Sequence, residues 1–105
     1  MNKPLVSNAF QTFMREAPEH AKAWMEVVQK LDNVSALDKK TEELAYIAVL
    51  AAVRLESGIT FHVKQAKANG ASREEIISAV LVGLPAVGNA VTSSLPIALE
   101  AYDNE

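Results

Sequence analysis

Residues 44–53, LAYIAVLAAV, are a run of ten residues without a charged side chain, and this run decides the fold. A helix that is apolar on every side needs neighbours on every side, so the run predicts a buried central helix. Glu42 and Glu43 precede the run and Arg54 follows it, which is the order of charges that a helix dipole favours. Asp38 is suited to the N-cap of this helix, and Ser57-Gly58 is expected to break it.

The sequence before the central run shows helical spacing twice. Apolar residues recur every three or four positions over residues 6–16, which predicts a first helix. Pro18 suits a first helical turn, so a second helix is expected from about Ala17 to a stop at Asp32-Asn33. Trp24 and Met25 on this second helix are predicted to lie in the core.

The sequence after the central run also reads as helices. A short helix is expected over residues 59–69, with Gly70 just beyond its end. Ser72 and Glu75 form a capping-box pattern, which predicts a helix from Arg73. Leu84-Pro85 interrupts it, and a last helix with a kink at Pro96 runs on to Tyr102. No alternating strand pattern is found, so the chain is predicted to be all-α with five or six helices.

The stretch Ile76–Leu99 has no charged side chain over 24 residues and is long enough to cross a bilayer. Pro, Gly, Ser, Thr and Asn interrupt it, so helices buried between subunits are the preferred interpretation and no membrane is expected. Half of the 105 residues are hydrophobic, which is rich for one small monomeric domain over 1–105 and indicates a homo-oligomer.

Composition excludes several functions. The chain has no Cys, so thiolate nucleophiles, disulfides and thiol redox chemistry are ruled out. The net charge is −3 and Lys39-Lys40 is the longest basic run, so no nucleic-acid partner is expected. Two His residues without Cys give a poor zinc set, so no metal is expected. No secretion signal is seen, and a cytoplasmic location is predicted.

Glu43 and His62 are the leading candidates for chemistry. His62 lies on the apolar face of its short helix, so its imidazole is expected to point inward, where it can move a proton. A carboxylate such as Glu43 within hydrogen-bond reach would fix the tautomer of the ring. Two structural interpretations stay open: a core histidine with a satisfied hydrogen bond, and a surface Glu that complements the helix dipole. Glu56 at the helix break and Asn89 in the last helix are candidate substrate-binding residues.

The segment 37–49 and the segment 61–76 together resemble the carboxymuconolactone decarboxylase and alkylhydroperoxidase-D-like family. The resemblance covers residues 18–101 and rests on the order of a helix, a break, a His, a helix, a Gly and a capped helix. It implies an all-α fold assembled as homotrimers or homohexamers. Peroxidase members carry a Glu, two Cys and a His at positions that fall here on Glu43, Leu55, Gly58 and His62. The two Cys are missing, so thiol peroxidase activity is not expected.

The decarboxylase branch of the family also lacks the Cys pair, and the chain looks closer to it. The resemblance implies an enzyme that needs no cofactor and acts on a small lactone or carboxylic acid, with His62 as the acid/base and Glu43 orienting it. Residues 55–58 contain an acid, and only Arg54 lies near them, so a strongly anionic substrate is not favoured. The alternatives are a non-catalytic oligomeric scaffold or small-molecule binder of the same fold, and a redox role through a partner's thiols.

Overall fold

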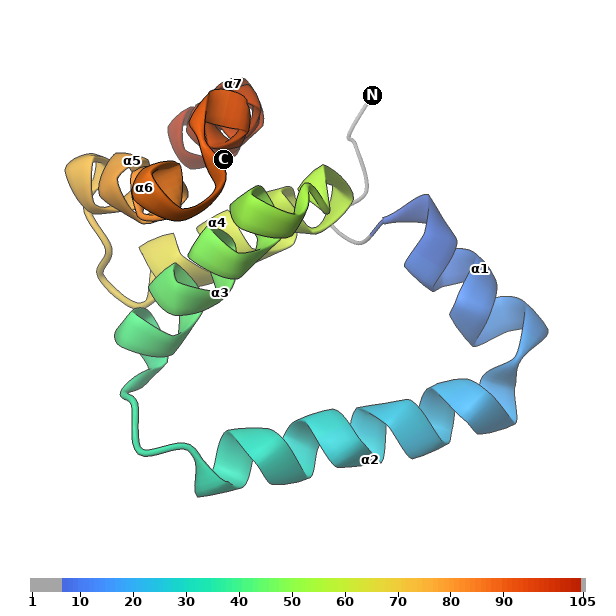
Figure 1. Ribbon diagram of the computed structural model, residues 1–105. Helices are drawn as coiled ribbons and strands as arrows, with labels where there is room; N and C mark the ends of the chain where they lie inside the picture. Colours follow the sequence, from blue (N-terminus) through green and yellow to red (C-terminus); the bar gives the residue numbers. More distant parts are fainter. Residues whose placement is uncertain (1–6, 105) are drawn as a thin grey trace. The chain divides into compact units, whose positions relative to one another are not determined.

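The computed structural model describes residues 7–104, and every regular element in that range is a helix (Figure 1). The α-helices are α1 (Asn8–Glu16), α2 (Pro18–Val34), α3 (Lys39–Val53), α4 (Ile59–Ala68), α5 (Arg73–Leu81), α6 (Leu84–Val87) and α7 (Leu95–Asp103), and the 3₁₀ segments are η1 (Glu56–Gly58) and η2 (Asn89–Ser94). Because α6 is a single turn of four residues, six longer α-helices remain. The predicted all-α class is confirmed.

The chain divides after Asp38 into two compact units, and the first contains α1 and α2. Ser7 caps α1, because its Oγ accepts a hydrogen bond from the Phe10 backbone N–H at 3.1 Å. Pro18 stands in the first turn of α2, where its missing N–H removes no helical hydrogen bond. α2 continues to Val34, slightly past the expected stop at Asp32-Asn33.

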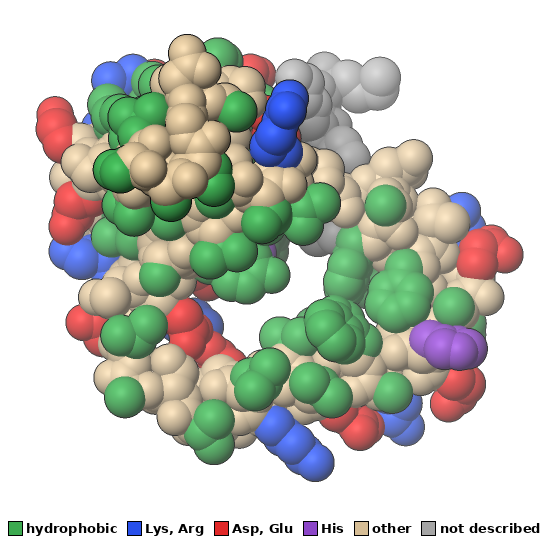
Figure 2. All heavy atoms as spheres, viewed as in Figure 1, with side chains coloured by type: hydrophobic (Ala, Val, Ile, Leu, Met, Phe, Trp, Pro, Cys, Tyr) green, Lys and Arg blue, Asp and Glu red, His purple; other side chains and the backbone are tan. Residues whose placement is uncertain are grey.

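The apolar face of α2 is exposed. The prediction that Trp24 and Met25 lie in the core is wrong, since they are 52% and 45% exposed and only Ala21 of α2 is buried. Further exposed apolar residues on α2 are Val27, Val28, Leu31 and Val34. Green hydrophobic side chains can be followed along this helix in Figure 2. Helical spacing identifies an apolar face, but it does not say whether another surface covers that face.

The second unit holds the hydrophobic core. Helix α3 packs on α4 and α5, and α7 packs on the same two helices. The buried apolar residues are Ile47, Leu50 and Ala51 of α3, Ile59, Val63 and Ala66 of α4, Ala71, Ile76, Ala79 and Val80 in and before α5, Val91 of η2, and Ala98 and Ala101 of α7. The central helix is therefore covered on this side, while Tyr46, Val49 and Val53 on its outer side remain exposed.

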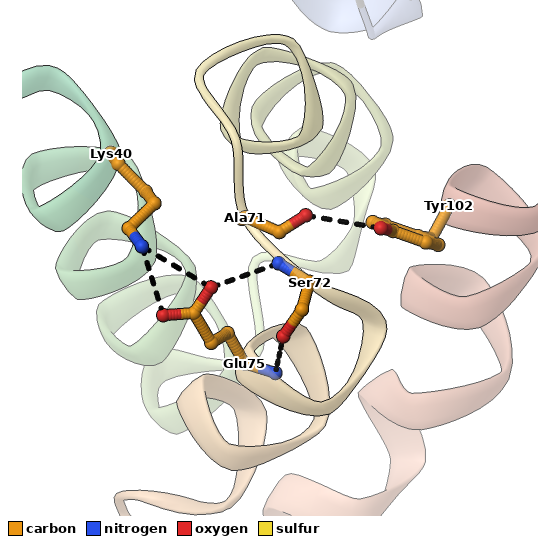
Figure 3. Close-up of polar contacts among 5 residues, drawn as sticks. All are labelled: Lys40, Ala71, Ser72, Glu75 and Tyr102. Carbon is orange, nitrogen blue, oxygen red and sulfur yellow. Dashed lines mark hydrogen bonds and ion pairs between the residues drawn. The ribbon is translucent and has the colours of Figure 1, made fainter.

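The start of α5 ties three helices of the second unit together (Figure 3). The Glu75 backbone N–H donates to Ser72 Oγ at 3.0 Å, and Glu75 Oε1 accepts from the Ser72 backbone N–H at 2.9 Å, so the predicted capping box is confirmed. Lys40 Nζ of α3 also contacts Glu75 Oε2 at 3.1 Å. The Tyr102 hydroxyl of α7 donates to the Ala71 carbonyl at 3.0 Å.

Side chains of α4 and α5 hold the end of α7. Lys64 Nζ donates to the carbonyl oxygens of Ala101 and Asn104 at 3.1 and 2.8 Å, and Lys67 Nζ donates to that of Tyr102 at 2.7 Å. Arg73 of α5 forms a bidentate ion pair with Asp103: its Nε donates to Oδ1 at 2.9 Å and its Nη2 to Oδ2 at 3.1 Å. The two lysines supply partners to carbonyl groups that the end of a helix leaves without any.

The break after α3 comes earlier than predicted. α3 ends at Val53, and Arg54 adopts a positive φ of 63° in place of a break at Ser57-Gly58. The Leu55 backbone N–H then donates to the Leu50 carbonyl at 2.9 Å, as in a Schellman-type helix end. Arg54 holds a position that glycine usually fills, which is why the sequence pattern does not reveal it.

The predicted last helix is divided into three pieces. Gly88, with a φ of 86°, separates α6 from η2, and α7 begins only at Leu95. Pro96 therefore lies in the first turn of α7, and the predicted kink there is wrong.

The uncharged stretch Ile76–Leu99 is buried in the second unit only in part, and Val82, Leu84 and Val87 within it are exposed. Several of its residues, such as Ile76, Val80 and Val91, belong to the core of this unit, so burial between subunits is not needed to explain them. Within residues 7–104, no helix is long and apolar enough to cross a membrane.

Candidate functional site

Glu43 and His62 meet between α3 and α4. Glu43 shares the core side of α3 with Ile47 and Leu50, four and seven residues later, and is itself only 7% exposed. His62 lies on α4 beside the buried residue Val63. The two helices place the His62 Nδ1 atom 2.7 Å from Glu43 Oε2. The structure thus brings together the two residues that the sequence singles out.

The two partners differ in how far water and small molecules can reach them. The Glu43 side chain is almost fully buried, whereas the His62 side chain is 21% exposed. A buried carboxylate requires a hydrogen-bonding partner, and the imidazole supplies one. The carboxylate accepts from Nδ1–H, so Nε2 is the ring nitrogen left for a second molecule. The arrangement is an anchored imidazole with one ring nitrogen available for proton transfer.

Two aromatic rings contact the imidazole. The Tyr46 ring stacks on it with centroids 4.1 Å apart and 26° between the planes. The Phe61 ring meets it edge-on, with centroids 5.1 Å apart at 87°. Tyr46 is not among the candidate residues that the sequence pattern indicates. Its position three residues after Glu43, on a neighbouring part of the α3 surface, is the signal that could have found it.

Glu56 and Asn89 lie on the 3₁₀ segments η1 and η2. Glu56 Oε1 of η1 accepts from the Ser93 hydroxyl of η2 at 2.5 Å. Asn89 is the exposed first residue of η2, directly after Gly88. η1 and η2 are therefore linked by a hydrogen bond, but among residues 7–104 neither Glu56 nor Asn89 has a hydrogen bond to Glu43 or His62.

A shallow apolar groove of about 650 Å³ lies elsewhere on the second unit, between α3 and α5. It is lined by Thr41, Leu44, Ala45, Ala48, Glu74, Glu75, Ser78, Ala79 and Val82. Neither Glu43 nor His62 lines it, so the groove is separate from the histidine site. Its small side chains allow another helix to approach closely.

Metal-binding groups do not cluster in the described part of the chain. Among residues 7–104, no three His, Asp or Glu side chains gather in a way that could hold a metal ion.

Comparisons with known proteins agree on one family. The sequence profile of the carboxymuconolactone decarboxylase family matches residues 18–100. The chain is also similar to the apo crystal structure of a carboxymuconolactone decarboxylase family protein from Legionella pneumophila, with 28% identity and a TM-score of 0.76. That match covers 90% of this chain and 85% of the other. No curated protein matches the sequence.

Proposed function

Because the chain belongs to the carboxymuconolactone decarboxylase family, we propose that it is a cofactor-independent acid/base enzyme acting on a small lactone or carboxylic acid. Glu43 orients His62, and His62 moves the proton. The observation that supports this proposal is the 2.7 Å contact between a buried carboxylate and a partly exposed imidazole. A thiol peroxidase mechanism is not part of it, since the chain has no cysteine.

In this proposal Glu43 and His62 carry out a single proton transfer. When a carboxylated lactone loses CO₂, the electron pair of the broken C–C bond stays on carbon, and that carbon must gain a proton. An imidazolium held by Glu43 through Nδ1–H donates the proton from Nε2–H and becomes neutral imidazole. Water then returns a proton to Nε2, and the site is ready again. The carboxylate keeps the ring in place and offsets its positive charge.

We propose that Glu56 and Asn89 contact the substrate. The hydrogen bond from Ser93 to Glu56 holds η1 and η2 together, so one substrate can reach both segments. In this role they affect substrate binding more than proton transfer. Their substitution is expected to raise KM and to leave kcat close to that of the wild type.

Assembly of several identical chains also belongs to the proposal. The exposed apolar face of α2, the outer side of α3 and the α3–α5 groove are surfaces that a soluble monomer rarely leaves uncovered. We propose a homotrimer or homohexamer in which these surfaces are covered and the two units act as one domain.

The test is turnover of a panel of carboxylated γ-lactones, followed by release of CO₂. His62→Ala is expected to lower kcat/KM by roughly 10²- to 10⁴-fold, the usual contribution of a positioned general acid. His62→Gln tests the same point while keeping a hydrogen-bond donor beside the buried Glu43. His20→Ala, at an exposed histidine of α2, is the matched control and should turn over normally. Unchanged turnover in His62→Ala would remove His62 from the mechanism, and a wild type inactive on the whole panel would favour the scaffold.

A further inference from the structure

Tyr46 contacts the imidazole, and the proton-transfer mechanism does not use it. Its ring is nearly parallel to that of His62 at 4.1 Å, yet 49% of the residue is exposed. A planar group that bonds to Nε2 in the plane of the imidazole therefore lies nearly parallel to the Tyr46 ring. Offset-stacked rings attract each other, so a planar substrate gains a contact that a puckered one does not.

The surface next to Tyr46 is apolar. Val49 and Val53 follow Tyr46 by three and seven residues and are also exposed on α3. The Phe61 ring contacts the imidazole edge-on. Val49, Val53 and Phe61 offer no donor to a carboxylate, so each charged substrate group beyond one that the His62 imidazolium binds needs another cation.

The second unit has few cations left for that purpose. Five of the six Lys and Arg side chains between residues 39 and 104 are held by other groups: Lys39 by Glu42, Lys40 by Glu75, Lys64 and Lys67 by carbonyls of α7, and Arg73 by Asp103. The sixth, Arg54, has no hydrogen bond or ion pair to any described residue. The unit can thus offer one uncommitted cation.

We propose that the Glu43–His62 site takes a planar, conjugated substrate with one carboxylate or none, and that Tyr46 selects this substrate by stacking. The inference rests on the proposed function, because it assigns the substrate to the same imidazole. It narrows the class of lactones and acids to those with an unsaturated, flat framework and low charge.

Three simple carboxylates test the proposal by binding alone. Benzoate is planar with one charge, cyclohexanecarboxylate has the same charge but a puckered ring, and terephthalate is planar with two charges. Each is titrated into the full chain at fixed pH, and the NMR shift of the His62 ring protons is followed. His20, which is exposed on α2, serves as the internal reference.

Benzoate is expected to bind roughly 2- to 10-fold more tightly than cyclohexanecarboxylate, the range that one aromatic stack contributes. Terephthalate should bind more weakly than benzoate, since its second carboxylate lacks a cation. Tyr46→Leu should abolish the preference for benzoate, and Tyr46→Phe should keep it. The shift of the His62 ring protons in the ligand-free Tyr46→Leu protein checks that the stack existed.

Three results would overturn the proposal: terephthalate binding as tightly as benzoate, a preference for benzoate that survives Tyr46→Leu, or no shift of the His62 protons with benzoate at tens of millimolar. None of these measurements needs turnover. The proposed function can therefore fail in the activity assay while the binding preference holds, and the reverse outcome is equally distinguishable.

Discussion

The two units of this chain bury the apolar surface of their helices to very different extents. In the second unit, α3, α4, α5 and α7 share a common core of thirteen buried apolar residues with η2 and the turn before α5. In the first unit, the 17-residue α2 buries Ala21 and leaves Trp24 and Leu31 exposed. Helical spacing is clear in α2, whereas the run 44–53 of α3 is apolar on every side. Periodicity therefore indicates which side of a helix is apolar, while burial depends on the surfaces available to it.

The largest expected effect is a difference in unfolding free energy between a core substitution in the second unit and a surface substitution in the first. Ile76→Ala empties a fully buried position and should lower the free energy of unfolding by about 2–5 kcal/mol at every protein concentration. Leu31→Ala removes a side chain that is 62% exposed and should cost less than about 0.5 kcal/mol in dilute, dissociated protein. In the proposed assembly, Leu31→Ala should shift association to higher concentration.

Chemical denaturation at several protein concentrations, together with analytical ultracentrifugation, measures both effects. If Leu31→Ala proved as costly as Ile76→Ala even in dilute protein, the apolar face of α2 would have to be buried within each chain, and the contrast between the units would disappear.

A smaller effect comes from the two serine caps. Ser72→Ala removes the capping box at the start of α5 and should destabilise the second unit by about 1 kcal/mol. Ser7→Ala removes the cap of α1, which has no buried residue, so it should loosen α1 without moving the unfolding midpoint of the core. Thermal unfolding monitored at Tyr102 and total helicity by circular dichroism distinguish the two outcomes. Ser72→Asp, which can still cap the helix, is the control. An equal drop in core stability for both alanine variants would contradict the distinction.

The smallest effect is a pH dependence located in the second unit. The backbone N–H of Ser72, followed by Lys40, holds the pKa of Glu75 below its ordinary value of 4.5. The hydrogen bond from Arg73 likewise holds the pKa of Asp103 below 3.8. A carboxyl group with a lowered pKa in the folded state stabilises the fold above its unfolded pKa. This stabilisation is lost as the pH falls through the folded pKa.

Stability should therefore decline below about pH 4.5, and Glu75→Gln should make that decline shallower. Glutamine can keep the capping hydrogen bond, so the variant removes mainly the charge. Glu74→Gln, at an exposed neighbour in the same turn, is the matched control. The measurement is unfolding midpoint against pH from 3 to 7. Identical acid profiles for the wild type and Glu75→Gln would show that this carboxylate does not contribute.

Local signals in the sequence predicted much of the fold. The capping box at Ser72, Pro18 in the first turn of α2 and Gly70 beyond α4 all act within a few residues, and each is found where expected. The break at Arg54 was missed because a non-glycine residue adopts the left-handed conformation there. The division of the last helix was missed because Gly88 ends α6 before Pro96 is reached.

The candidate site was predictable in its residues but not in its surroundings. The apolar face that carries His62 and the spacing of nineteen residues from Glu43 pointed to the pair. The contact between them depends on how α3 and α4 are aligned, which no local pattern fixes. Tyr46 was missed for a similar reason, since a tyrosine in an apolar run looks like any other core residue until a neighbouring ring is placed on it.

The side-chain contacts that hold the end of α7 have a mechanical consequence. A helix usually unwinds from its tip, where the last carbonyl groups lack partners. Here Lys64 and Lys67 of α4 bind the carbonyls of Ala101, Tyr102 and Asn104, and Arg73 of α5 binds Asp103. A force applied at residue 104 is therefore transmitted sideways into α4 and α5. The end of α7 can bear load as part of the bundle, and it yields only when these lateral bonds break together.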